Sequence, residues 1–316
     1  MKASADLCYS STFAVLDSDD IIVMVMVGKP VNITPEKSLE WDIQSRRYAT
    51  NVERLRKKDE RPFAGKAGHH SRGDYATVTF GVSYGGGRTV RIPFTISISR
   101  SLLPEAAVCV FKHIIFSSSS YWSTDALEFF FPLAHEVLCE RMRELHLHHP
   151  HLRFPFKNSV YPACTMNCGP QSVSFLHADG PDYPGIPGSI HAFGSFNPKH
   201  GGHLIAFDLK LFIQFPSGTL SLLSSSGMRH GNTPIQSNET RYSFTQYVSG
   251  HLIKWVAYGC RPAGQVGEEE KQRLDEVMRE GWHNQRARLS NFFRLNQDRL
   301  QSYMRRESVL RGTVAV

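Results

Sequence analysis

The sequence predicts an α+β fold in which a jelly-roll-like barrel of β-strands occupies the centre and helices flank it. Short runs rich in β-branched and aromatic residues follow one another between residues 160 and 260. Gly, Pro, Asn and Ser separate these runs at intervals of roughly 8–12 residues, which is typical of a sandwich or barrel. Apolar residues at helical spacing precede the strands at 124–152, and a second amphipathic stretch follows them at 267–307.

The composition is that of an ordinary globular protein. The chain has 316 residues, a formal net charge of +7 and a pI near 9.1. A chain of this length can bury a sizeable core without disulfide cross-links. We therefore expect the six cysteines to be reduced thiols in an intracellular compartment. No apolar run is long enough for a membrane span, and the N-terminus lacks a clean signal segment. The basic balance is compatible with a polyanionic partner.

The first third of the chain predicts strands around a basic segment. The apolar run "IIVMVMVG" (21–28) is bounded by acidic residues and by Gly-Lys-Pro, so it predicts a buried strand. Residues 40–74 are polar and basic, and we expect a helical start followed by a loop. Residues 75–97 alternate apolar and polar side chains around three glycines at 85–87, which indicates a hairpin of two strands.

The remaining elements follow in order. A helix is expected over 124–152, with Thr124 or Asp125 as its cap and Pro150 as its stop. Beyond it the chain is mostly strand, and the last stretch predicts one or two helices with a break near Gly281. The strands expected here cover residues 203–216, 218–226, 241–250 and 251–259.

A metal-binding pattern lies among these strands. "FLHADGPDYP" (175–184) places His177 and Asp179 two residues apart in a turn-rich run. His230 lies 51 residues past Asp179, directly after the strand "GTLSLLSSS" (218–226). Two imidazoles and one carboxylate form the facial triad of non-haem Fe(II) oxygenases, which leaves three metal positions open for a chelating cosubstrate and O2. We therefore expect Fe(II) at these three residues.

A second pattern points to the cosubstrate. Arg241 lies 11 residues after His230 on the next strand, and Ser243 follows two residues later on the same face. Oxygenases that use 2-oxoglutarate need a cation for its distal carboxylate, and a guanidinium pairs with a carboxylate through two hydrogen bonds. Arg241, together with Ser243, is therefore the expected 2-oxoglutarate site.

These motifs resemble a known family. "NCGPQSVSFLHADG" (167–180) and the stretch from "GSFNPKHGG" (194–202) to "WVAYG" (255–259) are similar to the fungal branch of the TET/JBP family, whose members are Fe(II)/2-oxoglutarate dioxygenases that oxidise modified bases in DNA. The resemblance is strong over residues 160–260 and looser over 40–87. It implies a cupin-like double-stranded β-helix, iron at His177, Asp179 and His230, and 2-oxoglutarate at Arg241. One departure is "GPDYPGIPGS" (180–189), since fungal members usually have a longer run without proline there.

The resemblance also implies a reaction and a location. We expect oxidation of the methyl group of 5-methylcytosine in DNA to the hydroxymethyl form and further, with the base flipped into the pocket. N6-methyladenine and thymine are alternative bases, and a 2-oxoglutarate hydroxylase of a protein or small molecule is an alternative activity. A nuclear location follows from the DNA substrate. Asp182 and His251 are the candidate substrate contacts, although a solvated turn would also explain Asp182.

Other polar clusters have simpler explanations. The histidines of 146–151 indicate a polar helix end, and Cys164 and Cys168 lack the second pair of ligands of a zinc finger. The expected DNA-backbone surfaces are the basic segment 54–72, which includes Arg56, Lys57 and Arg72, and the C-terminal arginines, namely Arg286, Arg288, Arg294, Arg299, Arg305 and Arg306. We expect a single domain with N-terminal strands and helix at 1–155, a catalytic core at 156–262 and a helical extension at 263–316.

Overall fold

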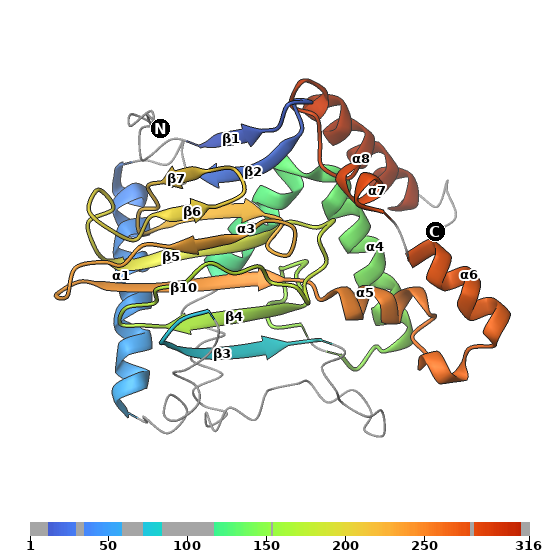
Figure 1. The fold of residues 1–316 in the computed structure, drawn as a ribbon, viewed down its shortest axis with the longest axis horizontal. Helices are drawn as coiled ribbons and strands as arrows, with labels where there is room; N and C mark the ends of the chain where they lie inside the picture. Colours follow the sequence, from blue (N-terminus) through green and yellow to red (C-terminus); the bar gives the residue numbers. More distant parts are fainter. Residues whose placement is uncertain are drawn as a thin grey trace.

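Two antiparallel sheets form the centre of the molecule (Figure 1). The computed structural model describes residues 12–29, 35–58, 72–83, 117–152, 154–278 and 281–310. Within these ranges the large sheet has the strand order β1 (Phe13–Leu16), β2 (Ile22–Val27), β8 (Thr219–Leu223), β5 (Gly188–Ser195), β10 (Thr240–Tyr247), β4 (Ala163–Cys168) and β3 (Ala76–Gly81). The small sheet has the order β7 (Leu211–Ile213), β6 (Leu204–Ala206) and β9 (His230–Asn232).

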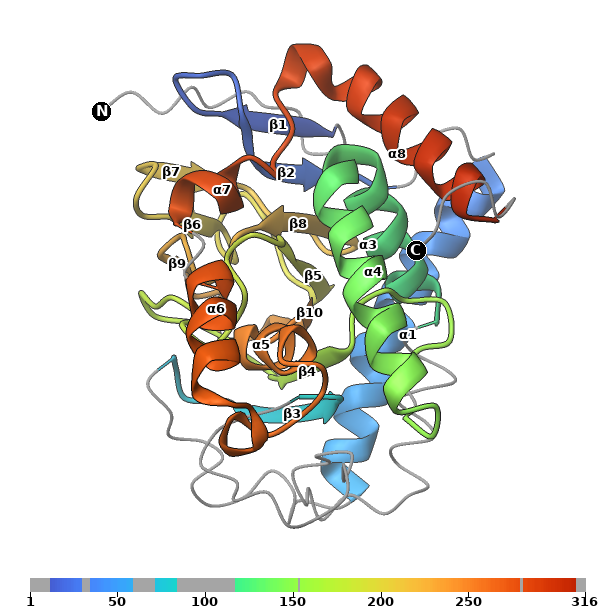
Figure 2. The same cartoon turned by 90° about the vertical axis from the view of Figure 1, so that its right-hand side faces the viewer.

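Helices cover one face of the large sheet and the small sheet covers the other (Figure 2). On the first face lie α1 (Pro35–Lys58), α3 (Ser117–Phe130) and α4 (Pro132–His148). The small sheet packs on the opposite face through a cluster that includes Met24, Ala192, Leu204 and Phe215. The later elements are α5 (Gly250–Ala257), α6 (Glu268–Met278), α7 (Trp282–Arg286) and α8 (Leu295–Leu310), with short 3-10 turns at Ala263–Gln265 and Phe292–Arg294. The expected mixture of helices and antiparallel strands is confirmed.

Alternation along β10 separates the core from a polar cavity. Tyr242 and Phe244 point to the helical side, where they pack in one cluster with Tyr48 and Val52 of α1. Arg241 and Ser243 point the other way and line the cavity. Because successive side chains of a strand face opposite sides of the sheet, one strand supplies both the core and the site.

The expected strand at 251–259 is wrong, because these residues form helix α5. Ser249 caps the helix, and its hydroxyl accepts a hydrogen bond from the backbone N–H of His251 at 3.3 Å. The buried residues are Leu252, Ile253, Trp255 and Val256, which lie on one side of a helix. A short apolar run is compatible with either element, and here the cap and the helical spacing prevail.

Two other expected elements are each divided in two. The run 203–216 forms β6 and β7, and Lys210 turns the chain between them with a φ of 55°. The helix expected over 124–152 starts earlier, at Ser117, and ends at Phe130; α4 then begins at Pro132, where proline suits the first helical turn. Thr124 is therefore no cap, and its hydroxyl instead accepts from the N–H of Val160 at 3.3 Å.

Several expectations are confirmed in the described ranges. Residues 22–27 form the buried strand β2, α1 gives the basic segment its helical start, and α4 ends at His148, just before Pro150. Gly281 caps α7 and so marks the break expected there. The glycines at 85–87, and with them the turn of the expected hairpin, lie outside the described residues. In the part of the chain described, no helix is long and apolar enough to cross a membrane.

Candidate metal centre and cosubstrate pocket

Backbone pairing brings the two candidate histidine ligands together. The N–H of His177 donates to the carbonyl of His230 at 3.0 Å, and the N–H of His230 donates to the carbonyl of His177 at 2.8 Å. His230 is the first residue of β9, so the small sheet presents it to the cavity. Asp179 follows two residues after His177, and its N–H is held by the carbonyl of Ser225 at 2.8 Å.

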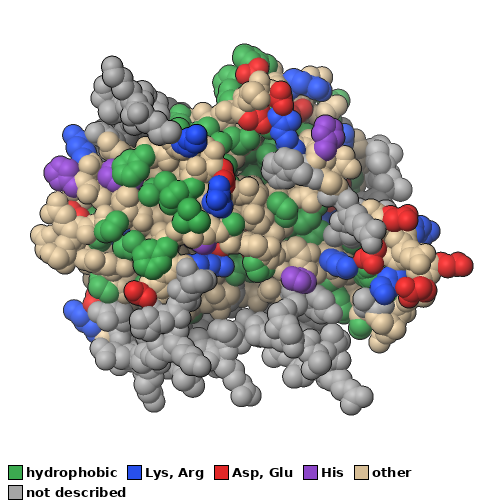
Figure 3. Space-filling model, in the orientation of Figure 1, with side chains coloured by type: hydrophobic (Ala, Val, Ile, Leu, Met, Phe, Trp, Pro, Cys, Tyr) green, Lys and Arg blue, Asp and Glu red, His purple; other side chains and the backbone are tan. Residues whose placement is uncertain are grey.

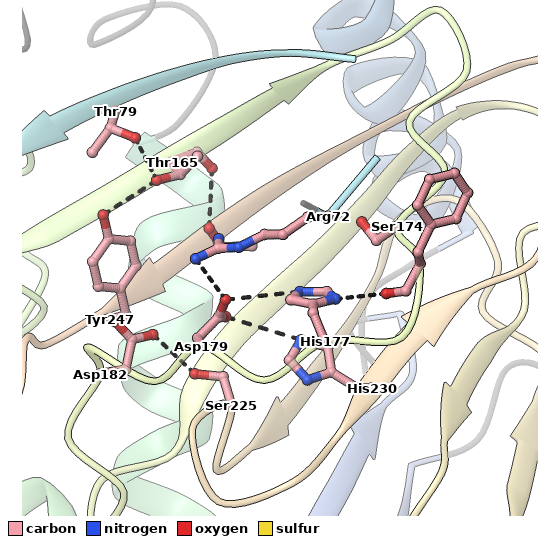
Figure 4. Close-up of polar contacts among 12 residues, drawn as sticks. Arg72, Thr79, Thr165, Ser174, His177, Asp179, Asp182, Ser225, His230 and Tyr247 are labelled. Carbon is pink, nitrogen blue, oxygen red and sulfur yellow. Dashed lines mark hydrogen bonds and ion pairs between the residues drawn. The ribbon is translucent and has the colours of Figure 1, made fainter. Parts of the chain in front are cut away.

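The three side chains converge on one point (Figure 4). His177 Nε2 lies 3.7 Å from Asp179 Oδ1, and His230 Nε2 lies 4.0 Å from Asp179 Oδ2. One ligand atom from each residue lies within 4.8 Å of the others, and no other such group of His, Cys, Asp and Glu occurs in the described residues. The structure thus brings His177, Asp179 and His230 together, as the sequence pattern predicted.

Hydrogen bonds orient both imidazoles for a metal. His177 Nδ1 lies 2.7 Å from the carbonyl oxygen of Phe175, and His230 Nδ1 lies 2.9 Å from that of Met228. A carbonyl only accepts, so each Nδ1 carries a proton, and in the neutral form of the ring Nε2 keeps its lone pair for the centre. Burial lowers the pKa of His230, and the neighbouring His177 lowers it further, which favours the neutral ligand form. This donor set fits Fe(II).

Arg72 is a component of the site that sequence reasoning assigned elsewhere. Its Nη2 lies 2.9 Å from Asp179 Oδ1, whereas we expected Arg72 to contact phosphate in the basic segment. The carbonyl of Arg72 accepts from the N–H of Phe175 at 2.6 Å, so this segment runs beside the one that carries His177. Gly73 permits that approach: its φ is +156°, and a Cβ atom there would lie 2.2 Å from the carbonyl oxygen of Val173. In the sequence, only the Arg72-Gly73 pair before β3 could have indicated that Arg72 belongs to the site.

Arg241 and Ser243 lie in the same cavity, which has a volume of about 500 Å3. Arg241 is 3% exposed and donates from Nη1 to the carbonyl of Ser172 at 3.1 Å, while its Nε has no hydrogen-bond partner among the described residues. Burial lowers the pKa of Arg241 to about 10, so the guanidinium stays charged at neutral pH. Ser243 Oγ accepts from Asn167 Nδ2 at 2.8 Å. A buried cation with unused donors is suited to an anionic ligand.

Asp182 lines the same cavity, next to Tyr247 and Ser225 (Figure 4). Ser225 donates its hydroxyl to Asp182 Oδ2 at 2.9 Å. Burial, together with the charge of the neighbouring Asp179, raises the pKa of Asp182 to about 7. The carboxyl group is therefore partly protonated near neutral pH and can both donate and accept hydrogen bonds.

A row of hydroxyls continues this wall, and sequence reasoning missed it. The hydroxyl oxygen of Thr165 lies 3.2 Å from that of Tyr247 and 2.8 Å from that of Thr79, so the three groups form a hydrogen-bonded row (Figure 4). These residues come from three neighbouring strands, β10, β4 and β3. Alternation within each strand was visible in the sequence, but the order of the strands in the sheet was not.

Other predicted residues lie away from the cavity. His251 is exposed on α5 and does not line the cavity. Cys164 and Cys168 are free thiols buried against α1. Most of the C-terminal arginines contact other parts of the chain, and four of them, besides Arg288, hold the segment 281–310 to the rest of the protein. These contacts are Arg286 with Asp17 and Asp19, Arg299 with the carbonyl of Phe129, Arg305 with Glu136, and Arg306 with Glu128.

The described part of the basic segment lies mostly on helix α1. Arg54 is exposed on α1, which covers the face of the large sheet opposite the cavity. Lys57 is exposed and pairs with Glu53 at 3.7 Å. The side chain of Arg56 and residues 59–71 are outside the described part of the chain. Of the described residues of this segment, Arg72 lines the cavity, and the contact of the segment with DNA stays a prediction.

Comparison with known proteins gives only distant structural likenesses. No protein-family model and no curated protein matches the chain. The chain is similar to NgTET1 in complex with 5mC DNA (TM-score 0.48, 15% identity, 75% of this chain and 76% of that one). It is also similar to OsALKBH1 (TM-score 0.32, 13% identity, 71% of this chain and 97% of that one). A third similar structure is the viral collagen prolyl hydroxylase vCPH of Paramecium Bursaria Chlorella virus-1 in its 2OG complex (TM-score 0.23, 15% identity, 34% of this chain and 67% of that one). Likenesses at these scores carry no conclusion about the reaction, which depends on the residues of the site.

Proposed function

We propose that this protein is an Fe(II)/2-oxoglutarate-dependent dioxygenase. The observation that carries the proposal is one cavity in which ligand atoms of His177, Asp179 and His230 lie within 4.8 Å of one another beside the buried guanidinium of Arg241. His177, Asp179 and His230 would hold the iron on one side and leave its other positions facing the cavity. When bound, iron supplies the activation of O2 that is coupled to decarboxylation of 2-oxoglutarate and oxidation of a C–H bond.

Two guanidinium groups match the two carboxylates of 2-oxoglutarate. Arg241 would bind the distal carboxylate, with help from the hydroxyl of Ser243 on the same face of β10. Arg72 already lies beside Asp179, so it offers a second cation for the carboxylate at the keto end. The small sheet would then be the minor sheet of a double-stranded β-helix, with the large sheet as the major one.

We propose DNA that carries a methylated base as the substrate, with 5-methylcytosine favoured. The likeness of residues 160–260 to the fungal TET/JBP family, proposed here as the chain's own family, supports this choice. Asp182 also supports it, because a carboxyl group with a pKa near 7 can donate to a ring nitrogen and accept from an exocyclic amino group. N6-methyladenine and thymine remain the alternative bases. A nuclear location is proposed with this substrate.

The test is a set of duplexes that carry one modified base each, incubated with the protein, Fe(II), 2-oxoglutarate and O2. We expect succinate to form together with 5-hydroxymethylcytosine, both measured by mass spectrometry, and we expect Asp179→Ala to abolish both products while the melting temperature remains close to wild type. If succinate forms without any oxidised nucleoside, the proposed 2-oxoglutarate-dependent reaction stands but the DNA substrate is refuted. That result would favour a hydroxylase of a protein or small molecule. Wild-type turnover in Asp179→Ala would refute the metal site itself.

A further inference from the structure

A segment near the C-terminus is fixed against the N-terminal hairpin. The N–H of Ile22 donates to the carbonyl of Ser290 at 3.0 Å, and the N–H of Phe292 donates to that of Asp20 at 2.8 Å. Asn291 Nδ2 also donates to the carbonyl of Asp19 at 2.9 Å. Leu289 is 4% exposed and belongs to the main hydrophobic cluster. These contacts give residues 281–292 a defined position in the fold.

From this position Arg288 reaches the loop between the metal centre and β5, residues 179–187, called the site loop below. Its Nη1 donates a hydrogen bond to the phenol oxygen of Tyr183, and its guanidinium carbon lies 5.4 Å from the centre of the Tyr183 ring. Gly185 marks a second close approach, because a Cβ atom there would lie 3.0 Å from Arg288 Nη1 and 3.3 Å from Gln285 Cβ. Tyr183 is only 8% exposed.

The site loop joins a metal ligand to the wall of the cavity. It begins at Asp179, whose carbonyl accepts from the N–H of Asp182 at 2.8 Å. Asp182 lines the cavity, and Tyr183 is the next residue. The N–H of Tyr183 is held by the carbonyl of Val248 at 2.9 Å. A shift of the Tyr183 ring would therefore be felt first at Asp182, its immediate neighbour.

We propose that Arg288 is a positioning residue that acts through Tyr183 to hold Asp182 in the cavity wall. The C-terminal segment thereby contributes to substrate selection, although none of its described residues lines the cavity itself. A charge-assisted hydrogen bond, a cation–π contact and the close packing against Gly185 together define the position of the ring. This inference rests on the proposed function for the role of Asp182 in substrate selection, while the mechanical link between Arg288 and the site loop is independent of that function.

The mechanical link is tested by amide hydrogen exchange on the 316-residue chain without metal. Arg288→Ala should increase the exchange rate of amides in residues 180–187 about tenfold, as expected for the loss of one charge-assisted hydrogen bond. Tyr183→Phe should give a similar increase, and the double variant should add little to either single change. Arg288→Lys should lie between wild type and Arg288→Ala. Arg273→Ala, which removes an exposed charge on α6, should leave the exchange of the loop unchanged.

The functional consequence is tested with methylated duplexes. Arg288→Ala should raise the KM for the duplex several-fold and lower the ratio of oxidised base to succinate, while the KM for 2-oxoglutarate stays within twofold of wild type. If wild type oxidises no base but exchange still responds to Arg288→Ala, the proposed substrate is wrong and the link stands. Two results with Arg288→Ala would together overturn the inference: an unchanged exchange rate in the site loop, and a slope of log DNA affinity against log salt concentration that is smaller in magnitude by roughly 0.9. They would show instead that Arg288 contacts a phosphate.

Discussion

Arg241 is a charged residue in a place where charges are rare. It is buried, and no carboxylate of the described residues lies within ion-pair distance of it. Taking an unpaired guanidinium out of water is costly, so a protein keeps one only when a partner binds there. Its Nη1 bonds only to the backbone and hydroxyl of Ser172, and Nε has no partner among the residues described. An anionic cosubstrate would fill that role.

Replacement of Arg241 is therefore expected to affect the cosubstrate first. Arg241→Ala should raise the KM for 2-oxoglutarate by an amount equivalent to roughly 2–5 kcal/mol, because a buried carboxylate would lose its charged partner. Arg241→Lys should recover only part of this loss, since Lys cannot make the forked contact. Steady-state kinetics with varied 2-oxoglutarate measure the effect.

Arg229 provides the matched control for this experiment. It is exposed and pairs with Asp208 at 2.6 Å on the outside of the protein, so Arg229→Ala should leave the KM for 2-oxoglutarate unchanged. Burial and pairing thus distinguish two arginines that lie only 12 positions apart. The opposite result, a normal KM in Arg241→Ala and a raised KM in Arg229→Ala, would move the cosubstrate site to the surface.

At the scale of elements, the metal centre depends on the pairing of β9 with the segment that carries His177. Gly231 follows His230, and a Cβ atom there would lie 2.8 Å from the carbonyl oxygen of Ser174 and 3.0 Å from that of Phe175. The backbones are therefore too close for any side chain. The same close approach brings both imidazoles to one point, because the two backbone segments pair at His177 and His230.

Gly231→Ala should accordingly weaken metal binding. We expect the two ligand-bearing backbones to separate and the affinity for Fe(II), or for Co(II) as a redox-stable probe, to fall about 10–100-fold. Gly180→Ala is the matched control in the same site, because no atom lies within 4 Å of the position a Cβ would take there. Metal affinity is measured by anaerobic titration. Equal affinity of the two variants would contradict the claim that the close backbone approach at Gly231 of β9 holds the two histidine ligands together.

At the scale of the whole molecule, the layers meet at His191 of β5. Its ring stacks on Trp41 of α1 at 6.1 Å and meets Trp122 of α3 edge to face at 5.5 Å. The side chain is 1% exposed, and Nε2 has no hydrogen-bond partner among the residues described. Burial lowers the pKa of His191 to about 3, so the ring is neutral wherever the protein is folded at ordinary pH.

This burial predicts acid sensitivity of the fold. Between about pH 6.5 and pH 3 the unfolded chain binds a proton at His191 that the folded protein does not, so the free energy of unfolding decreases as the pH falls. The slope from this residue approaches 1.4 kcal/mol per pH unit below about pH 5.5. His191→Phe keeps an aromatic ring and should remove that part of the slope in urea unfolding measured at several pH values. His283→Phe, at an exposed position on α7, should keep the wild-type slope.

The fold was predictable where local pattern determines it. Strands β8 and β10 follow from alternation and turn residues, and the break at Gly281 follows from a single glycine. The helix at 250–257 was not predicted, because a short apolar run fits either element and only its packing and the Ser249 cap distinguish them. The division of 203–216 into two strands likewise depends on Lys210, a residue type that seldom adopts positive φ.

The sequence by itself determined which residues to look for in the candidate site, since the residue types and spacings of His177, Asp179, His230 and Arg241 predict one reaction class. Only the tertiary structure decided what surrounds them. Arg72 and the hydroxyls of Thr79, Thr165 and Tyr247 reach the cavity because strands distant in sequence are neighbours in the sheet. The same holds for Arg288, which sequence reasoning assigned to DNA and the fold places against Tyr183. Residue type and spacing are local, whereas strand order and helix docking arise from contacts between distant parts of the chain, which no local pattern records.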